Sequence, residues 1–204
     1  MKLALIGTHG VGKTTLAHDA GALLKQTGRH AELVTEVVRR CPFPVNEQTT
    51  LEAQLWILHT QIAAELEAAH RSPLVLCDRS VLDHYCYLVN RCGRQPELER
   101  WLTRWLDSYT LLAGVPLVRE SIYAEGFRQP SLADGFRSTD RAFQQRIDAL
   151  LKELLTEPPF DAFADRVLWL DVIRQAQWAD TVREALATGR PPKAAAEDRP
   201  RAAH

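Results

Sequence analysis

The chain has 204 residues, 46% of them hydrophobic and 25% charged, and its formal net charge at pH 7 is -1. This balance is typical of one folded globular domain and argues against disorder. A net charge this small gives no global basic field, so duplex nucleic acid is not expected as a partner. No stretch reaches the ~18 apolar residues that span a bilayer, the first apolar run is too short for a signal peptide, and the four cysteines lack CxxC spacing. We therefore expect a cytoplasmic protein with no membrane association.

Short apolar runs alternate with helical patterns along the chain. Strands are predicted at 2–6, 31–35, 73–77, 115–118 and 167–170. The first helix is predicted at 13–26, and the second runs from a Thr49/Glu52 capping box to about residue 70. A helix follows Ser80, a helical hairpin continues up to Gly114, and a last helix runs from Phe143 to Leu154. The long second helix is expected to bury one face, consisting of Leu51, Leu55, Leu58, Ile62 and Leu66. This order predicts an α/β protein with a mostly parallel sheet covered on both faces.

Residues 7–14 read GTHGVGKT and match the pattern G-x-x-x-x-G-K-[ST], between a predicted strand and a predicted helix. In such a loop, main-chain N–H groups surround phosphate oxygens, and the N-terminus of the following helix adds partial positive charge. Lys13 is predicted to reach the β- and γ-phosphates, Thr14 to bind Mg²⁺, and Thr15 to contact the α-phosphate. His9 is interpreted as a solvated loop residue. The candidate nucleotide-binding residues are Gly7, Gly10, Val11, Gly12, Lys13, Thr14 and Thr15.

Asp78 and Arg79 directly follow the third predicted strand, at the edge where open α/β sheets bind ligands. Asp78 is predicted to hold Mg²⁺, directly or through water, and the alternative is a helix cap. Arg79 is predicted to bind an anion, and the alternative is a surface arginine.

Glu36 follows the second strand and faces the same edge, where a carboxylate could accept the proton of an attacking hydroxyl. Its alternative is an ordinary solvated glutamate. Arg39 is either a substrate contact or solvated. Gln54 and Gln61 lie seven residues apart on the long helix, where an amide could hydrogen-bond a planar ring or could face solvent.

The segment 120–140 is rich in glycine and arginine and has little periodicity. Its arginines suit a lid that closes on a transferring phosphoryl group, with a charged solvated loop as the alternative. Beyond residue 187, Pro, Ala and charged residues dominate. We therefore expect one domain over 1–187 and a disordered tail over 188–204.

With these residues in place, the sequence from about 1 to 171 resembles the P-loop small-molecule kinases, near the nicotinamide riboside kinase domains and the thymidylate and deoxynucleoside kinases. Many proteins of this kind are described as AAA-type ATP-binding proteins. The resemblance is carried by GTHGVGKT at 7–14, TEVVRR at 35–40, DRS at 78–80 and DGFR at 134–137. It implies a three-layer P-loop fold with a five-stranded parallel sheet in the order 2-3-1-4-5 and a helical lid.

The same resemblance assigns roles to residues of this chain. It places the general base on Glu36, the acid-Arg-Ser motif on Asp78, Arg79 and Ser80, and the lid arginines on Arg137 and Arg141. The thymidylate kinase pattern has other residues where this chain has Val37 and Ser80, which argues against thymidylate as the acceptor. The candidate catalytic residues are Lys13, Glu36, Asp78 and Arg137; the candidate substrate-binding residues are Glu36, Arg39, Gln54, Arg79, Arg137 and Arg141; the candidate metal ligands are Thr14 and Asp78.

The predicted function is an ATP-dependent phosphotransferase that acts on a nucleoside, nucleotide or related metabolite, with ATP and Mg²⁺ as cofactors. The alternative is a regulatory ATP- or GTP-binding protein that acts through a protein partner. The guanine-reading segment Asn-Lys-x-Asp does not occur in the sequence, which favours ATP. The acceptor and the oligomeric state, a homodimer included, stay open.

Overall fold

The computed structural model describes residues 1–117 and 140–190. Five parallel strands form its sheet in the order β2-β3-β1-β4-β5, which confirms the predicted fold class and strand order. The strands are β1 (Lys2–Ile6), β2 (Glu32–Val34), β3 (Val75–Cys77), β4 (Leu111–Gly114) and β5 (Val167–Trp169). The central β1 pairs with β3 on one side and β4 on the other, so the loop that leaves β1 lies at the middle of the sheet's carboxyl edge.

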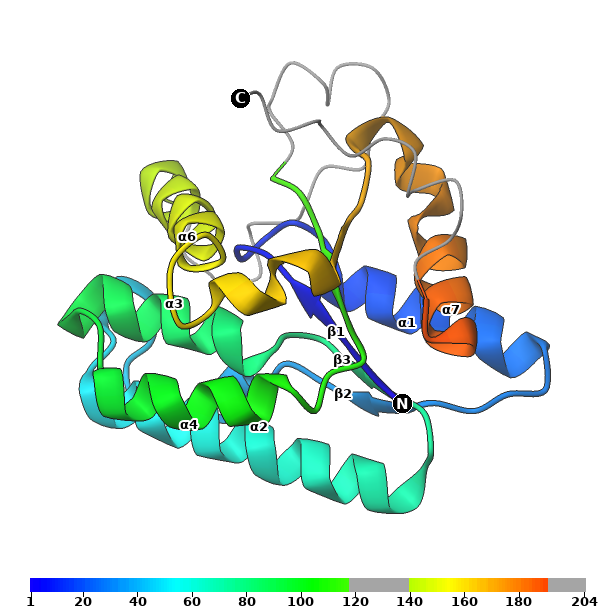
Figure 1. The fold of residues 1–204 in the computed structure, drawn as a ribbon, viewed down its shortest axis with the longest axis horizontal. Helices are drawn as coiled ribbons and strands as arrows, with labels where there is room; N and C mark the ends of the chain where they lie inside the picture. Colours follow the sequence, from blue (N-terminus) through cyan, green and yellow to red (C-terminus); the bar gives the residue numbers. More distant parts are fainter. Residues whose placement is uncertain (118–139, 191–204) are drawn as a thin grey trace.

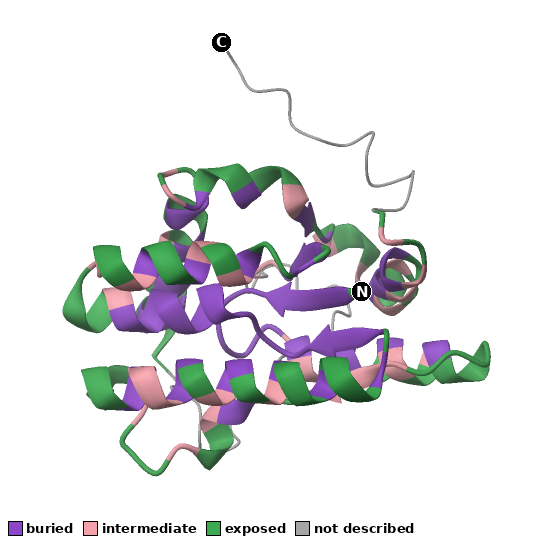
Figure 2. Ribbon diagram, turned by 60° about the horizontal axis from the view of Figure 1, so that its bottom comes forward, coloured by how far each residue is buried: buried purple, intermediate pink, exposed green. Residues whose placement is uncertain are grey.

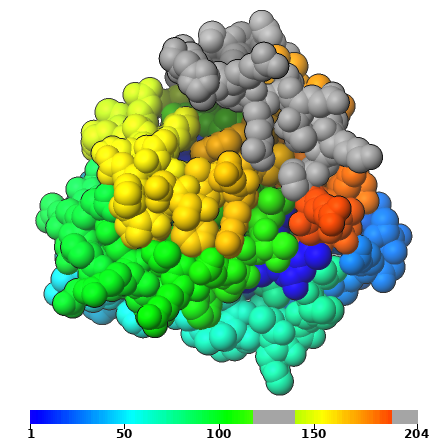
Figure 3. Space-filling view, viewed as in Figure 1, coloured from blue at the N-terminus to red at the C-terminus, as the bar shows by residue number. Residues whose placement is uncertain are grey.

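Helices cover both faces of the sheet, with α1 and α7 on one face and α2, α3, α4 and α6 on the other (Figure 1). The α-helices are α1 (Lys13–Gln26), α2 (Leu51–Arg71), α3 (Val81–Cys92), α4 (Pro96–Leu106), α6 (Arg141–Leu154) and α7 (Trp178–Thr188). Short 3-10 helices are η1 (Val37–Arg40), η2 (Asn46–Gln48), η3 (Asp161–Arg166) and η4 (Val172–Gln177). In the space-filling view, the yellow surface of α6 and the segment after it borders the green helical surface, and α6 packs on α3 (Figure 3).

The alternation of side chains along β1 explains the three layers. Leu3 and Leu5 belong to the core under α1 and α7, whereas Ala4 and Ile6 belong to the core under α2, α3 and α6. All of β1 is buried, and the helices around it are buried only along the faces that meet the sheet or one another (Figure 2). A strand buried on both faces needs an apolar run rather than an alternating pattern, which is what the sequence has here.

The fourth strand was predicted at 115–118, and this prediction is wrong. β4 is Leu111–Gly114, paired in register with Leu3–Ile6 of β1. The apolar run at 111–113 had been assigned to the preceding helical hairpin, but α4 already ends at Leu106. Pro116 lacks the N–H group that continued strand pairing requires, which is a physical reason for the ladder to stop before it.

Two details of the long helix α2 also differ from the prediction. Its N-cap is Thr50, whose hydroxyl accepts a hydrogen bond from the Ala53 N–H, rather than Thr49. Of the face predicted to be buried, Leu51 and Leu66 are exposed. The buried face carries Gln54, Gln61 and Glu65 among its apolar residues, so a hydrophobic pattern alone placed it incorrectly.

Part of what the sequence predicted lies outside the described residues. The lid loop with Arg137, except Asp140 at its end, falls in the gap between 117 and 140, and most of the predicted tail lies beyond 190. Helix α7 continues through Thr188, the first residue assigned to that tail. Within the described ranges, no helix has the length and apolar character needed to cross a membrane.

Candidate functional site

The phosphate loop, residues 7–14, runs from the end of β1 into the first turn of α1. Its Gly7 has φ +145°, and a Cβ there would lie 2.6 Å from the Val115 carbonyl oxygen. This position therefore has no room for any side chain. Gly12 is the N-cap of α1 in the left-handed conformation, at φ 92°. In the described part of the chain, no side chain caps this helix end. The first N–H groups of α1 can therefore meet an anion.

Lys13 is the first residue of α1, and its side chain turns back over the loop. Its Nζ donates to the carbonyl oxygens of Gly7 and Thr8, both at 2.6 Å. Burial, followed by repulsion from Arg79, lowers the pKa of Lys13 to about 7. Carbonyl oxygens carry no full negative charge, and a phosphate group would supply one to this buried amine.

Thr14 and Asp78 meet at the end of β3. The Thr14 hydroxyl donates to Asp78 Oδ2 at 2.6 Å, and burial raises the pKa of Asp78 above its ordinary value. Helix α3 is capped by Ser80, so Asp78 is not its N-cap. A hydroxyl and a carboxylate side by side are hard oxygen ligands of the kind Mg²⁺ prefers, so this pair fits the predicted metal site.

Asp83 links the phosphate loop to α3, a contact that the sequence did not reveal. It completes a capping box with Ser80, in which its Oδ2 accepts a hydrogen bond from the Ser80 N–H at 2.9 Å. Its other oxygen, Oδ1, accepts from the Gly7 N–H at 2.8 Å. One carboxylate thus fixes both the start of α3 and the start of the loop.

Glu36 and Arg79 form a buried ion pair, with side chains 4% and 5% exposed. Glu36 Oε1 accepts from Arg79 Nε at 2.9 Å and Nη2 at 2.7 Å. Arg39, which is exposed, donates from Nε to Glu36 Oε2 at 3.2 Å. Glu36 is therefore not a solvated glutamate, and Arg79 is not a surface arginine, which were the alternatives for these two residues. Arg79 has φ 135°, a strained conformation for a non-glycine residue that aims its side chain at Glu36.

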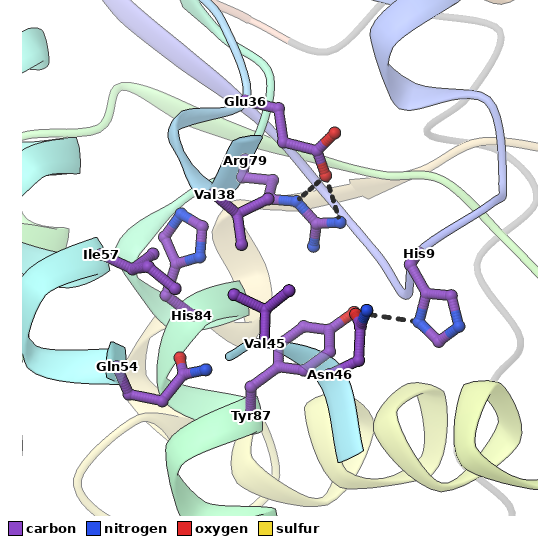
Figure 4. Close-up of a pocket in the computed structure, with 10 residues that line it drawn as sticks. All are labelled: His9, Glu36, Val38, Val45, Asn46, Gln54, Ile57, Arg79, His84 and Tyr87. Carbon is purple, nitrogen blue, oxygen red and sulfur yellow. Dashed lines mark hydrogen bonds and ion pairs between the residues drawn. The ribbon is translucent and has the colours of Figure 1, made fainter. Parts of the chain in front are cut away.

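A pocket lies beside this ion pair (Figure 4). It encloses about 400 Å³, including space open to solvent. We call it the Glu36 pocket, and its lining residues are His9, Glu36, Val38, Val45, Asn46, Gln54, Ile57, Arg79, His84 and Tyr87. The lining combines apolar side chains with a few polar groups, as sites for small molecules usually do.

Two buried polar atoms in the lining have no hydrogen-bond partner among the described residues, Gln54 Oε1 and Arg79 Nη1. The Gln54 amide is held by its other end, since Nε2 donates to Thr49 Oγ1 at 2.7 Å. Buried polar atoms are normally satisfied, so this acceptor and this donor are open to hydrogen bonds from a polar ligand in the pocket. Gln54 is therefore not a surface amide.

His84 contributes a neutral ring to the same pocket. Burial, together with repulsion from Arg79, lowers the pKa of His84 to about 3. Its Nε2 lies 3.4 Å from Oε1 of Gln61, which is buried but does not line the pocket. Gln61 instead donates to the Arg79 carbonyl oxygen at 3.1 Å and so supports the strained residue.

The interpretation of His9 as a solvated residue is wrong, because its ring is 2% exposed and lies in the pocket wall. Its Nδ1 is 3.1 Å from the hydroxyl of Tyr87 (Figure 4). The sequence missed His9, His84 and Tyr87 as pocket residues, and no spacing signal marks them. The helical periodicity of α3 does place His84 and Tyr87 on one face, but which face meets the pocket depends on tertiary packing.

The structure thus brings together most of the candidate residues at the carboxyl edge of the sheet. Arg137 lies outside the described residues, and Arg141 is exposed at the first position of α6. Thr15 is exposed on the first turn of α1.

Several solved structures share this fold. Deoxyadenosine kinase from M. mycoides with bound dATP aligns with a TM-score of 0.61 and 16% identity, covering 92% of this chain and 100% of that chain. A NadR protein in complex with NR aligns with a TM-score of 0.62 and 17% identity, covering 94% of this chain and 53% of that chain. Thymidylate kinase from Ehrlichia chaffeensis aligns with a TM-score of 0.60 and 17% identity, covering 92% and 98%.

A search of curated proteins by sequence found no match. A family model described as "AAA domain" matches residues 2–166, a range that contains the phosphate loop, the Glu36–Arg79 pair and the Thr14–Asp78 pair. The resemblance predicted from the sequence is confirmed at the level of family and fold. The chain belongs to the AAA domain family of P-loop proteins.

Proposed function

We propose that this protein is an ATP-dependent phosphotransferase that moves the γ-phosphoryl group of ATP to a hydroxyl of a small molecule. The observation that carries the proposal is that His9 belongs to the phosphate loop and also lines the Glu36 pocket. A site for a second small ligand therefore adjoins the site for a phosphate chain. Phosphoryl transfer needs this adjacency, because its catalysis consists mainly of positioning and charge neutralisation.

On the nucleotide side, the N–H groups of the phosphate loop would surround the phosphates, and Lys13 would exchange its two carbonyl partners for phosphate oxygens. Thr14 and Asp78, whose side chains are 2.6 Å apart, would hold Mg²⁺. When bound, the metal supplies positive charge to the β- and γ-phosphate oxygens. Asp83 keeps the loop in place through the Gly7 N–H.

On the acceptor side, Glu36 would take the proton of the attacking hydroxyl. The hydroxyl oxygen forms a bond to the γ-phosphorus, the bond from that phosphorus to the bridging oxygen of ATP breaks, and ADP leaves with the electron pair. Arg79 fixes the direction of the Glu36 carboxylate through two hydrogen bonds to Oε1. Its free Nη1 would donate to an oxygen of the acceptor.

The polarity of the pocket indicates the type of acceptor. In the described lining, the charged side chains are Glu36 and Arg79, and they neutralise each other. Ile57, Val38 and the Tyr87 ring offer apolar contact, and Gln54 Oε1 offers an acceptor for an N–H group. A nucleoside or a related ring-bearing metabolite fits this combination. The deoxyadenosine kinase, by its name an enzyme that acts on a nucleoside, and the NadR structure in complex with NR support an acceptor of this class.

The test compares ATP turnover by the purified protein alone and with each member of a panel of nucleosides, nucleoside monophosphates and vitamin nucleosides. We expect slow hydrolysis alone and faster turnover, with a phosphorylated product, for one member or a related group. Lys13→Ala serves as the inactive control. If no member accelerates turnover or becomes phosphorylated, the kinase proposal fails and the regulatory alternative takes its place.

A further inference from the structure

Helix α6 is joined to the phosphate loop by two buried hydrogen bonds that have no role in the proposed chemistry. Gln144 Nε2 donates to the His9 carbonyl oxygen at 2.6 Å. In the opposite direction, Thr8 Oγ1 donates to the Gln144 carbonyl oxygen at 2.9 Å. Gln144, Thr8 and His9 are 3%, 0% and 2% exposed, so water does not compete for these bonds.

Thr8 and His9 each connect this junction to a different ligand site. The Thr8 carbonyl oxygen accepts one of the two hydrogen bonds that hold the Lys13 amine. The His9 ring lines the Glu36 pocket, where its Nδ1 hydrogen-bonds with the Tyr87 hydroxyl (Figure 4). The centroid of the His9 ring lies 5.5 Å from the centroid of the Phe143 ring. Gln144 therefore contacts the side-chain hydroxyl of Thr8 and the main-chain carbonyl of His9. The first of these loop residues helps to hold the Lys13 amine on the nucleotide side, and the second forms part of the pocket wall on the acceptor side.

Gln144 is itself held rigidly. The residues of α6 that flank it in the core, Phe143 and Ile147, are buried against the helices that cover this face of the sheet. A side chain on a fixed helix can act as a template for a loop that would otherwise have to become ordered when its ligand binds. Such pre-organisation improves affinity by reducing the ordering cost.

We propose that Gln144 is a positioning residue that fixes the Thr8–His9 part of the phosphate loop and thereby places both the Lys13 amine and the His9 ring. The part of the inference that concerns the His9 ring and the acceptor rests on the proposed function. The part that concerns the Lys13 amine requires only that the phosphate loop binds ATP. Loss of the Gln144 amide leaves the buried His9 carbonyl oxygen without this donor, and the loop then relaxes away from the conformation that both ligands use.

The test uses Gln144→Met, which keeps the length of the side chain and removes the donor. Gln145→Met is its control, because Gln145 is the next residue and is exposed. Calorimetric titration with MgATP, without acceptor, should give a dissociation constant about fivefold higher for Gln144→Met than for the wild type. Gln145→Met should bind like the wild type. In steady-state assays, the KM values for both ATP and acceptor should rise in Gln144→Met.

A merely structural role would lower the melting temperature of Gln144→Met and leave its MgATP affinity within twofold of the wild type. That result would overturn the proposal. If Gln144→Met does not fold, Thr8→Val and Thr8→Ser replace it. Valine removes the hydroxyl and should weaken MgATP binding, whereas serine keeps the hydroxyl and should restore it; equal affinity in the two variants would also overturn the proposal. Failure of the kinase proposal is recognised separately, as a wild type that binds MgATP and phosphorylates no acceptor.

Discussion

Binding of MgATP at pH 8 should be coupled to uptake of a proton by Lys13. In the ligand-free protein, burial and the nearby Arg79 lower the pKa of the Lys13 amine to about 7. At pH 8 most of these amines are therefore neutral. The phosphate oxygens of a bound nucleotide favour the charged amine and raise its pKa again. We expect each bound nucleotide to bring most of one proton onto the protein at this pH.

The measurement is titration calorimetry at pH 8 in two buffers that differ in their enthalpy of ionisation. The difference in observed heat divided by the difference in ionisation enthalpy gives the number of protons taken up. Lys13→Met is the control, because it keeps an extended side chain and removes the amine. Lys13→Met should bind MgATP more weakly, and at a protein concentration high enough to measure this binding it should show no proton uptake.

Wild-type binding without proton uptake at pH 8 would refute the argument from burial, since Lys13 would then already carry its charge in the ligand-free protein.

The same pKa shift has a consequence for the pH dependence of the free energy of unfolding. The ordinary pKa of a lysine amine in water is 10.5, so between pH 7 and 10.5 the unfolded chain binds more protons at Lys13 than the native protein does. The stability of the ligand-free protein therefore gains a contribution as pH rises through this window, and Lys13→Met should lose it.

Three further substitutions test separate parts of the site and fold. Glu36→Gln should lower kcat by roughly a hundredfold while MgATP affinity stays near that of the wild type, and a normal kcat on the true acceptor would end the general-base role. Asp78→Asn should raise the Mg²⁺ concentration for half-maximal rate roughly tenfold or more, and an unchanged Mg²⁺ dependence would contradict the metal assignment. Gly114→Ala should destabilise the fold by about 1–3 kcal/mol in denaturant titration, because its Cβ would lie 2.3 Å from the Trp169 ring. Adding Trp169→Ala should recover part of that loss, and a fully additive effect would show that the ring is not the cause.

The phosphate loop and the strands next to it could be predicted from the sequence because their signals are local. Gly7 and Gly12 are required by the backbone conformation, and Asp78 follows a short apolar run of strand length that begins at a proline. The order of the strands came from family resemblance. Parallel pairing is a long-range property that no single segment contains.

The pocket was less predictable because its polar residues are buried through contacts between distant elements. Glu65, on the buried face of α2, accepts hydrogen bonds from Lys2, Trp105, Tyr109 and Gln61. A helix that buries such a network shows a weak hydrophobic pattern, so the buried face of α2 was misplaced. The sequence did not mark Gln144 as a contact of the phosphate loop either. Single glutamines are common on amphipathic helices, and only the fold shows that this one bonds with the loop.

The fourth strand illustrates a different limit. Residues 111–113 and 115–118 are both apolar runs of strand length, and periodicity does not separate them from the end of a helix. Pairing with β1 shows which run is the strand, because Leu3–Ile6 of β1 pair with Leu111–Gly114. The last main-chain hydrogen bond of this pairing runs from the Val115 N–H to the Ile6 carbonyl oxygen.

The most direct test of the proposed function is to follow the γ-phosphate itself. The protein is incubated with Mg²⁺ and ATP labelled in the γ-position, together with the acceptor that accelerates turnover most in the panel, and the labelled products are separated and identified. Wild-type protein should place the label on a hydroxyl of the acceptor, in equal amount to the ADP formed, and Glu36→Gln should do so roughly a hundredfold more slowly. If the label appears only as inorganic phosphate while ADP accumulates, the protein hydrolyses ATP without transferring it, and the assignment of the Glu36 pocket to a phosphoryl acceptor is contradicted.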